Sequence, residues 1–169
     1  MIIGLLLVAV IVLSILRRWR DLAFLVTAVA LEASVALVSS IAVDRPRPSL
    51  IRLEGIPPTR SFPSGHTAAA IALYVGLAIL TAPRVRFTAL RTAIWALAVL
   101  LPFWVGISRI YRGMHHATDV LGSLLLGALA LGAAWLVVGS TASAWRRRQV
   151  AARPQMTAEP TPHPAEVGP

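Results

Sequence analysis

Two short segments of the chain carry the residue types that could act on a phosphate group. One is Pro63-Ser64-Gly65-His66, and the other is SRIYRGMHHATD, from Ser108 to Asp119. Together they supply histidines, arginines and an aspartate, and each lies at the end of a long apolar stretch. An imidazole nitrogen can attack phosphorus while guanidinium groups bind the phosphate oxygens. These segments therefore predict phosphate chemistry through a histidine, provided that the fold brings them to one membrane face.

The second segment places a histidine and a carboxylate on one helical face. His115 and Asp119 are four residues apart, so their side chains would be neighbours on a helix or helical turn. A carboxylate bonded to one ring nitrogen fixes the tautomer and leaves the other nitrogen free to attack. We expect His116 to face another way. In the alternative interpretation Asp119 only complements a helix N-terminus, with Thr118 as the cap.

The first segment has the features of a helix start that could bind an anion. Ser64 is a good N-cap, and Gly65 lets backbone amides approach a ligand closely. Free amides at a helix N-terminus attract phosphate, and His66 would stand in the first turn beside the bound anion. A plain capped helix with a surface histidine explains this tetrapeptide equally well.

Arginine placement predicts an orientation in the membrane and an anion site on one side. The chain has no lysine, and arginine supplies all of the positive charge behind its net +9. Most arginines lie in alternate connections and after the last apolar stretch, which the positive-inside tendency assigns to the cytoplasm. Six lie in the opposite connections or at the helix end beside them: Arg45, Arg47, Arg52, Arg60, Arg109 and Arg112. Phosphate binding would explain them, although contact with lipid headgroups is the alternative for any single residue.

Five apolar stretches must position these residues. They run roughly over residues 1–16, 22–43, 66–82, 89–110 and 118–140. The chain is 57% hydrophobic and has a mean hydropathy of +0.74. Its hydrophobic fraction is above the about 45–50% of ordinary soluble domains. We expect an all-α, polytopic transmembrane helical bundle with five spans, the first of them short.

Several details refine this expectation. Pro46 and Pro48 would end the second helix and present the neighbouring arginines just outside the bilayer. In the last stretch Ser123 and Gly127 would permit close helix packing. We expect one membrane-embedded domain over residues 1–145 and a disordered cytoplasmic tail over residues 146–169.

Composition excludes other classes of protein. Long apolar runs argue against a soluble nucleic-acid binder, so nucleic acid is not an expected partner. The absence of cysteine excludes disulfides, thiolate metal sites and cysteine phosphatases. No lysine is present for a phosphate-binding P-loop, no Gly-x-Ser-x-Gly elbow occurs, and the extracytoplasmic loops carry too few carboxylates for a two-metal hydrolase. Histidine is the nucleophile that remains.

The motifs resemble those of the type 2 phosphatidic acid phosphatase superfamily, which also includes bacterial undecaprenyl-diphosphate phosphatases. The family's third motif is Ser-Arg, five residues, His, three residues and Asp. It is matched by Ser108, Arg109, His115 and Asp119, and residues 63–66 match the second motif. The resemblance covers roughly residues 17–140.

The chain departs from the family in two places. The first motif normally has a lysine, six further residues and then an Arg-Pro pair, but here Ser40 or Val38 stands at the lysine position. One phosphate contact is therefore missing or replaced, with Arg45, Arg60 and Arg112 as candidates. Membrane members of the family typically have six helices, so this chain either starts late or is a shortened form.

The resemblance implies a mechanism and a set of site residues. His115 would attack phosphorus, Asp119 would orient it, and His66 would act first as acid and then as base. The phosphate would be bound by Arg45, Arg47, Ser64, Gly65, Ser108 and Arg109. Neither a metal nor a cofactor would be required. The substrate would be a lipid phosphate or diphosphate monoester, hydrolysed at the extracytoplasmic face of the cell membrane, with the C-terminus in the cytoplasm.

Two other functions stay open at this point. A phosphotransferase would use the same histidine but pass the phosphate to an alcohol. A non-catalytic lipid-phosphate binder or transporter would explain the missing lysine, but it would not need His66, His115 and Asp119. A vanadate-dependent peroxidase shares the motifs but is disfavoured, because such relatives are soluble and larger. The identity of the lipid and the oligomeric state are not indicated.

Overall fold

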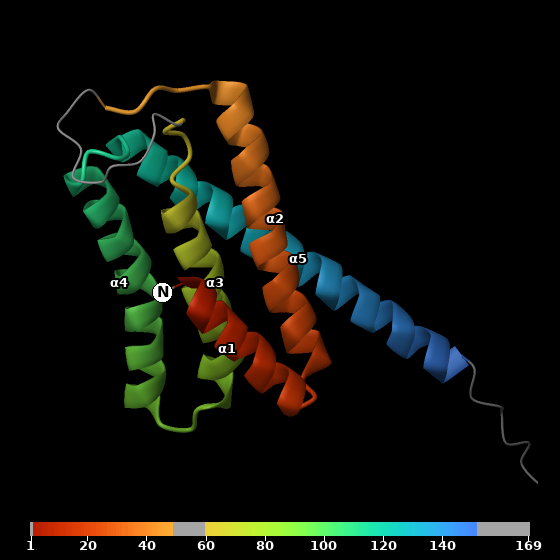
Figure 1. Ribbon diagram of the computed structural model, residues 1–169. Helices are drawn as coiled ribbons and strands as arrows, with labels where there is room; N and C mark the ends of the chain where they lie inside the picture. Colours follow the sequence, from red (N-terminus) through yellow and green to blue (C-terminus); the bar gives the residue numbers. More distant parts are fainter. Residues whose placement is uncertain (1, 49–59, 152–169) are drawn as a thin grey trace, which may run out of the picture.

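The chain folds into a helical bundle, shown as a ribbon in Figure 1. The computed structural model describes residues 2–48 and 60–151, the last of these, 140–151, by their backbone alone. The regular structure in these ranges is entirely helical, so the predicted all-α class is confirmed. The helices are α1 (Ile2–Ile15), α2 (Trp19–Val43), α3 (Gly65–Thr81), α4 (Thr88–Tyr111) and α5 (Ala117–Ala151), with a 3-10 turn, η1 (Ala82–Arg84), after α3.

The number of helices that could span a membrane is smaller than the predicted five. Within the described residues four helical segments are long and apolar enough: Trp19–Val43, Gly65–Arg84, Thr88–Tyr111 and Ala117–Gly139. Helix α1 has 14 residues, and at 1.5 Å per residue it reaches roughly 21 Å, less than the ~30 Å hydrocarbon core. It ends where Arg17 adopts a positive φ of 52° and the chain turns into α2. The protein is therefore a multi-pass membrane protein with four candidate spans and one shorter apolar helix.

Helix α3 lies at the centre of the bundle. It packs against α4 on one side and against α2 and α5 on the other (Figure 1). Small residues allow this close approach, and Ala68, Ala70 and Ala72 have no exposed surface. The faces of α2, α4 and α5 that point away from α3 carry exposed leucine, valine and aromatic side chains, as expected for surfaces in contact with lipid.

Glycines fix the contact between α3 and α5. A Cβ atom added at Gly127 would lie 2.8 Å from Ile71 Cγ2 and 3.3 Å from the Ala68 carbonyl oxygen. At Gly76 it would lie 3.2 Å from a methyl group of Leu25 on α2. The packing role predicted for Gly127 is confirmed, because no larger residue fits without a shift of its neighbours.

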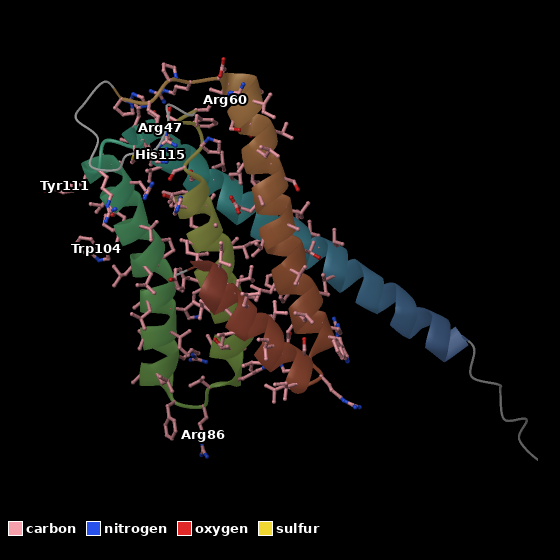
Figure 2. All side chains as sticks on the ribbon, in the orientation of Figure 1. Arg47, Arg60, Arg86, Trp104, Tyr111 and His115 are labelled. Atoms are coloured by element: carbon pink, nitrogen blue, oxygen red, sulfur yellow. The ribbon has the colours of Figure 1, made fainter. Side chains whose placement is uncertain are left out.

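The chain connections gather at the two ends of the bundle. The end of α2 and the starts of α3 and α5 lie at one end, together with the end of α4 (Figure 1). Arg47, Arg60 and His115 lie at this end, whereas Arg86, in the connection between α3 and α4, lies at the other (Figure 2). Helix α5 continues to Ala151, past the predicted domain boundary at residue 145. The remainder of the predicted tail, residues 152–169, lies outside the described residues, as does Arg52.

Candidate active site

The segment after α2 forms one wall of the site. Helix α2 ends at Asp44, which has a positive φ of 44°, and two prolines then prevent further helix. The segment leading to α3 runs beside it, since the Ser61 amide donates a hydrogen bond to the Arg45 carbonyl oxygen at 2.8 Å. Ser61 Oγ also donates to the Pro46 carbonyl oxygen at 3.0 Å. These bonds join the segment after α2 to the segment before α3.

A tight turn between α4 and α5 carries His115. Gly113 has a φ of 66°, and the Met114 amide returns to the Arg109 carbonyl oxygen at 3.1 Å. The glycine is required here because this backbone conformation is strained for other residues. The turn places His115 inside the site, with only 5% of its surface exposed.

The ring of His115 is held by a backbone carbonyl group. Its Nδ1 lies 2.6 Å from the Ser61 carbonyl oxygen. A carbonyl oxygen can only accept a hydrogen bond, so Nδ1 carries the hydrogen and Nε2 keeps its lone pair. Burial lowers the pKa of His115 below its ordinary value, and the positive charges of Arg47 and Arg109 act in the same direction. The neutral imidazole is therefore favoured, as a nucleophile requires.

The expectation that Asp119 binds the His115 ring directly is wrong. Asp119 Oδ2 lies 4.0 Å from His115 Nδ1, beyond hydrogen-bond distance. The same oxygen instead accepts the His116 amide at 2.8 Å and lies 3.2 Å from His116 Nδ1. The expectation that His116 faces away is thus also wrong. The reason is that the chain is not helical before Ala117, so the i, i+4 spacing does not bring the two side chains together.

Asp119 also has the position of a helix-capping residue. It is the third residue of α5, and its carboxylate accepts the amide of the residue just before the helix, as an acidic residue does in a capping box. Thr118, which was the alternative cap, is the second residue of α5. Its hydroxyl group accepts a hydrogen bond from Arg45 at 2.6 Å.

The two arginines of the first motif occupy different environments. Arg47 donates to the Met114 carbonyl oxygen at 3.2 Å, and its charge acts on His115, to which it lies close in Figure 2. Arg45 instead binds Asp119 Oδ1 at 2.8 Å. Asp119 has no exposed surface, so this ion pair compensates its buried charge. Arg47 therefore fits the role of the phosphate-binding arginine, whereas Arg45 supports the carboxylate.

Arg60 and Arg112 were the other candidates to replace the lysine that is missing from the first motif. Arg60 forms an ion pair with Asp44 at 2.6 Å, and both side chains are exposed. Arg112 is exposed at the end of α4. Ser40 lies on α2, and its hydroxyl donates to the Leu37 carbonyl oxygen of its own helix at 2.7 Å.

The Pro63–His66 segment begins α3 as predicted, but its serine does not cap an amide. Ser64 is the residue before the helix, yet its fully buried hydroxyl pairs with Thr67 Oγ1 at 3.0 Å. Gly65 is exposed, and a Cβ atom there would meet nothing within 4 Å. His66 is exposed in the first turn. A ligand could therefore approach the backbone amides of this turn at Gly65, which has no side chain and is exposed.

A serine that the sequence did not single out for the site joins the starts of α3 and α5. Ser123 Oγ lies 3.0 Å from the Ser64 carbonyl oxygen and 2.7 Å from that of Asp119. The Ser64 amide also approaches the Asp119 carbonyl oxygen at 3.4 Å. These contacts bring the turn that holds His66 to the same end of the bundle as His115. Convergence of the two rings on one ligand stays a prediction.

The remaining predicted residues lie at the end of α4. The carbonyl oxygen of Ser108 accepts the amide of Arg112 at 3.1 Å, which closes the helix. Arg109 is partly buried, and its charge acts on His115. Ser61 was missed by sequence reasoning, because it acts through a carbonyl group that every residue possesses.

The helices and this end of the bundle define a class of protein: a polytopic membrane protein with a buried histidine among arginines and an aspartate. The sequence model of the PAP2 superfamily matches residues 21–142, and the chain belongs to this superfamily. The resemblance inferred from the motifs is thereby confirmed.

Curated proteins of known name are similar over part of the chain. A phosphatidylglycerophosphatase B of Bacillus subtilis is 39% identical over 70 residues, which are 41% of this chain and 34% of the relative. A lipid A 1-phosphatase of Rhizobium etli is 30% identical over 114 residues, 62% of this chain and 45% of the relative. The chain thus spans less than half of the length of these relatives.

Solved structures share the fold. The crystal structure of Aquifex aeolicus LpxE superposes with a TM-score of 0.62 at 27% identity, covering 78% of this chain and 76% of that one. A PAP2-type phosphatidylglycerolphosphate phosphatase from Bacillus subtilis gives a TM-score of 0.65 at 24% identity, covering 84% and 75%. The helical arrangement is therefore that of known membrane proteins of this superfamily.

Proposed function

We propose that this protein is a metal-independent lipid phosphate phosphatase that works through a phosphohistidine on His115. The observation that carries the proposal is the state of that ring. Its Nδ1 donates to the Ser61 carbonyl oxygen, and burial beside two arginines lowers the pKa of the ring, which favours its neutral form. Nε2 then keeps the lone pair that a nucleophile needs, and the charges of Arg47 and Arg109 that act on the ring would also attract an anion. Membership in the PAP2 superfamily and the names of the relatives support the same reaction class.

The first step transfers the phosphoryl group to the enzyme. Nε2 of His115 attacks phosphorus, and the bond between phosphorus and the leaving oxygen breaks. Protonated His66 gives its proton to that oxygen, so the lipid leaves as an alcohol or, from a diphosphate, as a monophosphate. Arg47 and Arg109 bind the equatorial oxygens while charge redistributes in the transition state.

The second step restores the enzyme. Neutral His66 takes a proton from water, and the resulting hydroxide attacks the phosphohistidine. The bond between phosphorus and Nε2 breaks, inorganic phosphate leaves, and both histidines return to their starting states. The amide of Gly65 would bind the same phosphate oxygens, since the start of α3 is open to a ligand.

Asp119 and Arg45 have a supporting role in this scheme. Because Asp119 binds His116 and Arg45 and not the His115 ring, it positions the turn before α5. Ser64 and Ser108 have a structural role in this scheme, since the Ser64 hydroxyl pairs with Thr67 and the Ser108 carbonyl oxygen accepts the Arg112 amide. Thr118 shares the Arg45 guanidinium with Asp119.

The site at the end of four apolar helices suits an amphiphilic substrate. The acyl or prenyl chains can remain in the bilayer while the headgroup meets the arginines at its surface. The relatives carry the names of a phosphatidylglycerophosphatase and a lipid A phosphatase, so a phosphorylated membrane lipid is the proposed substrate class. The positive-inside tendency of the arginines supports an extracytoplasmic position for this end and a cytoplasmic one for the end of α5.

Release of phosphate from defined lipids tests the proposal. Purified protein would be assayed against phosphatidate, phosphatidylglycerophosphate and undecaprenyl diphosphate, with EDTA and with vanadate. We expect turnover of at least one lipid that persists in EDTA and is inhibited by vanadate. The His115→Ala variant should lose about 10³-fold or more in kcat, since it removes the proposed acceptor of the phosphoryl group. Arg86→Ala, at the opposite end, is the matched control, and metal-dependent turnover would contradict the scheme.

A further inference from the structure

A cavity lies at the end of the bundle opposite the catalytic site. Its volume is about 340 Å³, and it lies between the start of α2, the end of α3 and the outer part of α5. The floor and walls are apolar, formed by Phe24, Leu80 and Trp135 among others. Phe24 and Trp135 meet edge to face, with ring centroids 6.0 Å apart. The volume is in the range of small-molecule sites.

Charged side chains line the rim of this cavity with an excess of positive charge. Asp21 is bound by Arg18, from the turn before α2, and by Arg84 at 3.0 Å, from η1. Arg84 also donates to the Leu80 carbonyl oxygen. Arg20 lines the cavity as well, and among the described residues it has no ion-pair partner. Three arginines and one carboxylate therefore lie around this rim, which leaves an excess of two positive charges.

The combination of an apolar interior and a cationic rim has a clear chemical complement. Arg18, Arg20 and Arg84 lie where α2 begins and where α3 ends, which is the level of the headgroups if these helices span the bilayer. A basic pocket between transmembrane helices at this level is suited to an anionic headgroup. Acyl carbons from the same molecule can cover Trp135, which is 61% exposed beside the buried Phe24. An anion without an apolar part would leave the Trp135 ring uncovered.

We propose that this cavity binds an anionic phospholipid of the bilayer, as a site separate from the catalytic one. The phosphate would contact Arg20 and Arg84, and the first part of an acyl chain would lie against Phe24 and Trp135. The lipid would join α2, α3 and α5 where direct contact between them is incomplete. The inference does not depend on the proposed reaction, because it concerns residues at the other end of the bundle.

Lipid-dependent stability tests this site. Purified protein in a neutral detergent would be titrated with phosphatidylglycerol, and Tm would give an apparent Kd. We expect Tm to rise with phosphatidylglycerol and to change little with phosphatidylcholine or inorganic phosphate. Arg20→Gln should weaken the apparent affinity about fivefold. Arg86→Gln is the matched control, because Arg86 is exposed over Phe87 and does not line the cavity.

The other outcomes would overturn the proposal. An equal rise with phosphatidylcholine would show that charge is not recognised, and an equal rise with inorganic phosphate would show that the acyl chain is not bound. If Arg47→Gln removed the effect and Arg20→Gln did not, the lipid would be bound at the catalytic end. Arg84 also contacts Asp21 and Leu80, so Arg84→Gln can lower Tm by itself. Arg20→Gln, which breaks no ion pair with a described residue, keeps the test decisive.

Discussion

At the scale of single residues, the proposed mechanism makes the pH range of activity depend on the protonation of His115. In that mechanism the attacking ring must be neutral, and burial together with two arginines lowers its pKa below 6.5. A lowered pKa keeps the ring neutral to more acidic pH than an ordinary histidine. The acid limb of kcat/KM should therefore have its midpoint below 6.5, as measured by a pH profile with a soluble short-chain lipid phosphate.

Removal of the positive charge of Arg47 should shift the acid limb of the kcat/KM profile to higher pH. Arg47→Gln removes a positive charge that lowers the pKa of His115. The pKa should rise, and the acid limb should move to higher pH in addition to the loss of rate. Arg60→Gln is the control, because Arg60 pairs with Asp44 and its charge is not among the causes of the His115 shift. A limb that stays in place in Arg47→Gln would contradict the assignment of His115 as the titrating nucleophile.

The ion pair between Arg45 and Asp119 should couple stability and activity. Asp119 has no exposed surface, so Arg45→Gln leaves a buried carboxylate with less compensation. We expect a loss of about 1–2 kcal/mol in unfolding free energy, and a much smaller further loss when Asp119→Asn is added. A double-mutant cycle in SDS-induced unfolding measures this coupling. Arg60→Gln, which breaks an exposed pair, should cost less than about 1 kcal/mol, and strict additivity of the two site variants would refute the coupling.

At the scale of helices, the contact between α3 and α5 depends on Gly127. A methyl group there would lie 2.8 Å from Ile71, so Gly127→Ala should destabilise the protein by about 1–3 kcal/mol. Gly132 lies on the same helix with nothing within 4 Å of its added Cβ. Gly132→Ala should be neutral or stabilising by up to about 1 kcal/mol, because alanine favours the helix. Comparison of the two unfolding free energies separates packing from helix propensity.

The helices themselves could be predicted from the sequence because each is a long apolar run. The predicted stretches 22–43 and 89–110 differ from α2 and α4 by only a few residues. The end of the last helix, α5, could not be predicted in the same way. Arginines after residue 145 indicate the end of a span, but they do not break a helix, and α5 continues to Ala151.

The site was only partly predictable, because its key contact does not depend on side-chain type. The sequence indicated His115, Arg47 and Arg109 correctly as neighbours. It did not indicate the Ser61 carbonyl group as the partner of the ring, since this contact joins residues 54 positions apart through the backbone. The i, i+4 spacing favoured Asp119, but that rule applies only where both residues are helical.

At the scale of the whole molecule, the fold separates the arginines into two groups for which we propose different tasks. Arg47 and Arg60 lie with His115 at the proposed extracytoplasmic end, and Arg86 lies at the opposite end (Figure 2). Arg20 and Arg84 line the cavity near the start of α2 and the end of α3. Under both proposals the chain would present a catalytic site to one leaflet and a lipid-binding site to the other.

This arrangement makes a direct prediction about membrane topology. The chain has no cysteine, so single cysteines can be introduced as unique labels. Arg60→Cys and Arg86→Cys place a thiol at exposed positions on opposite ends of the bundle (Figure 2). In intact cells a membrane-impermeant maleimide should label the thiol at position 60, whereas the one at 86 should react only after the membrane is opened. Labelling of both positions from the same side would mean that α3 does not cross the bilayer, and labelling in the reverse order would place His115 at the cytoplasmic face.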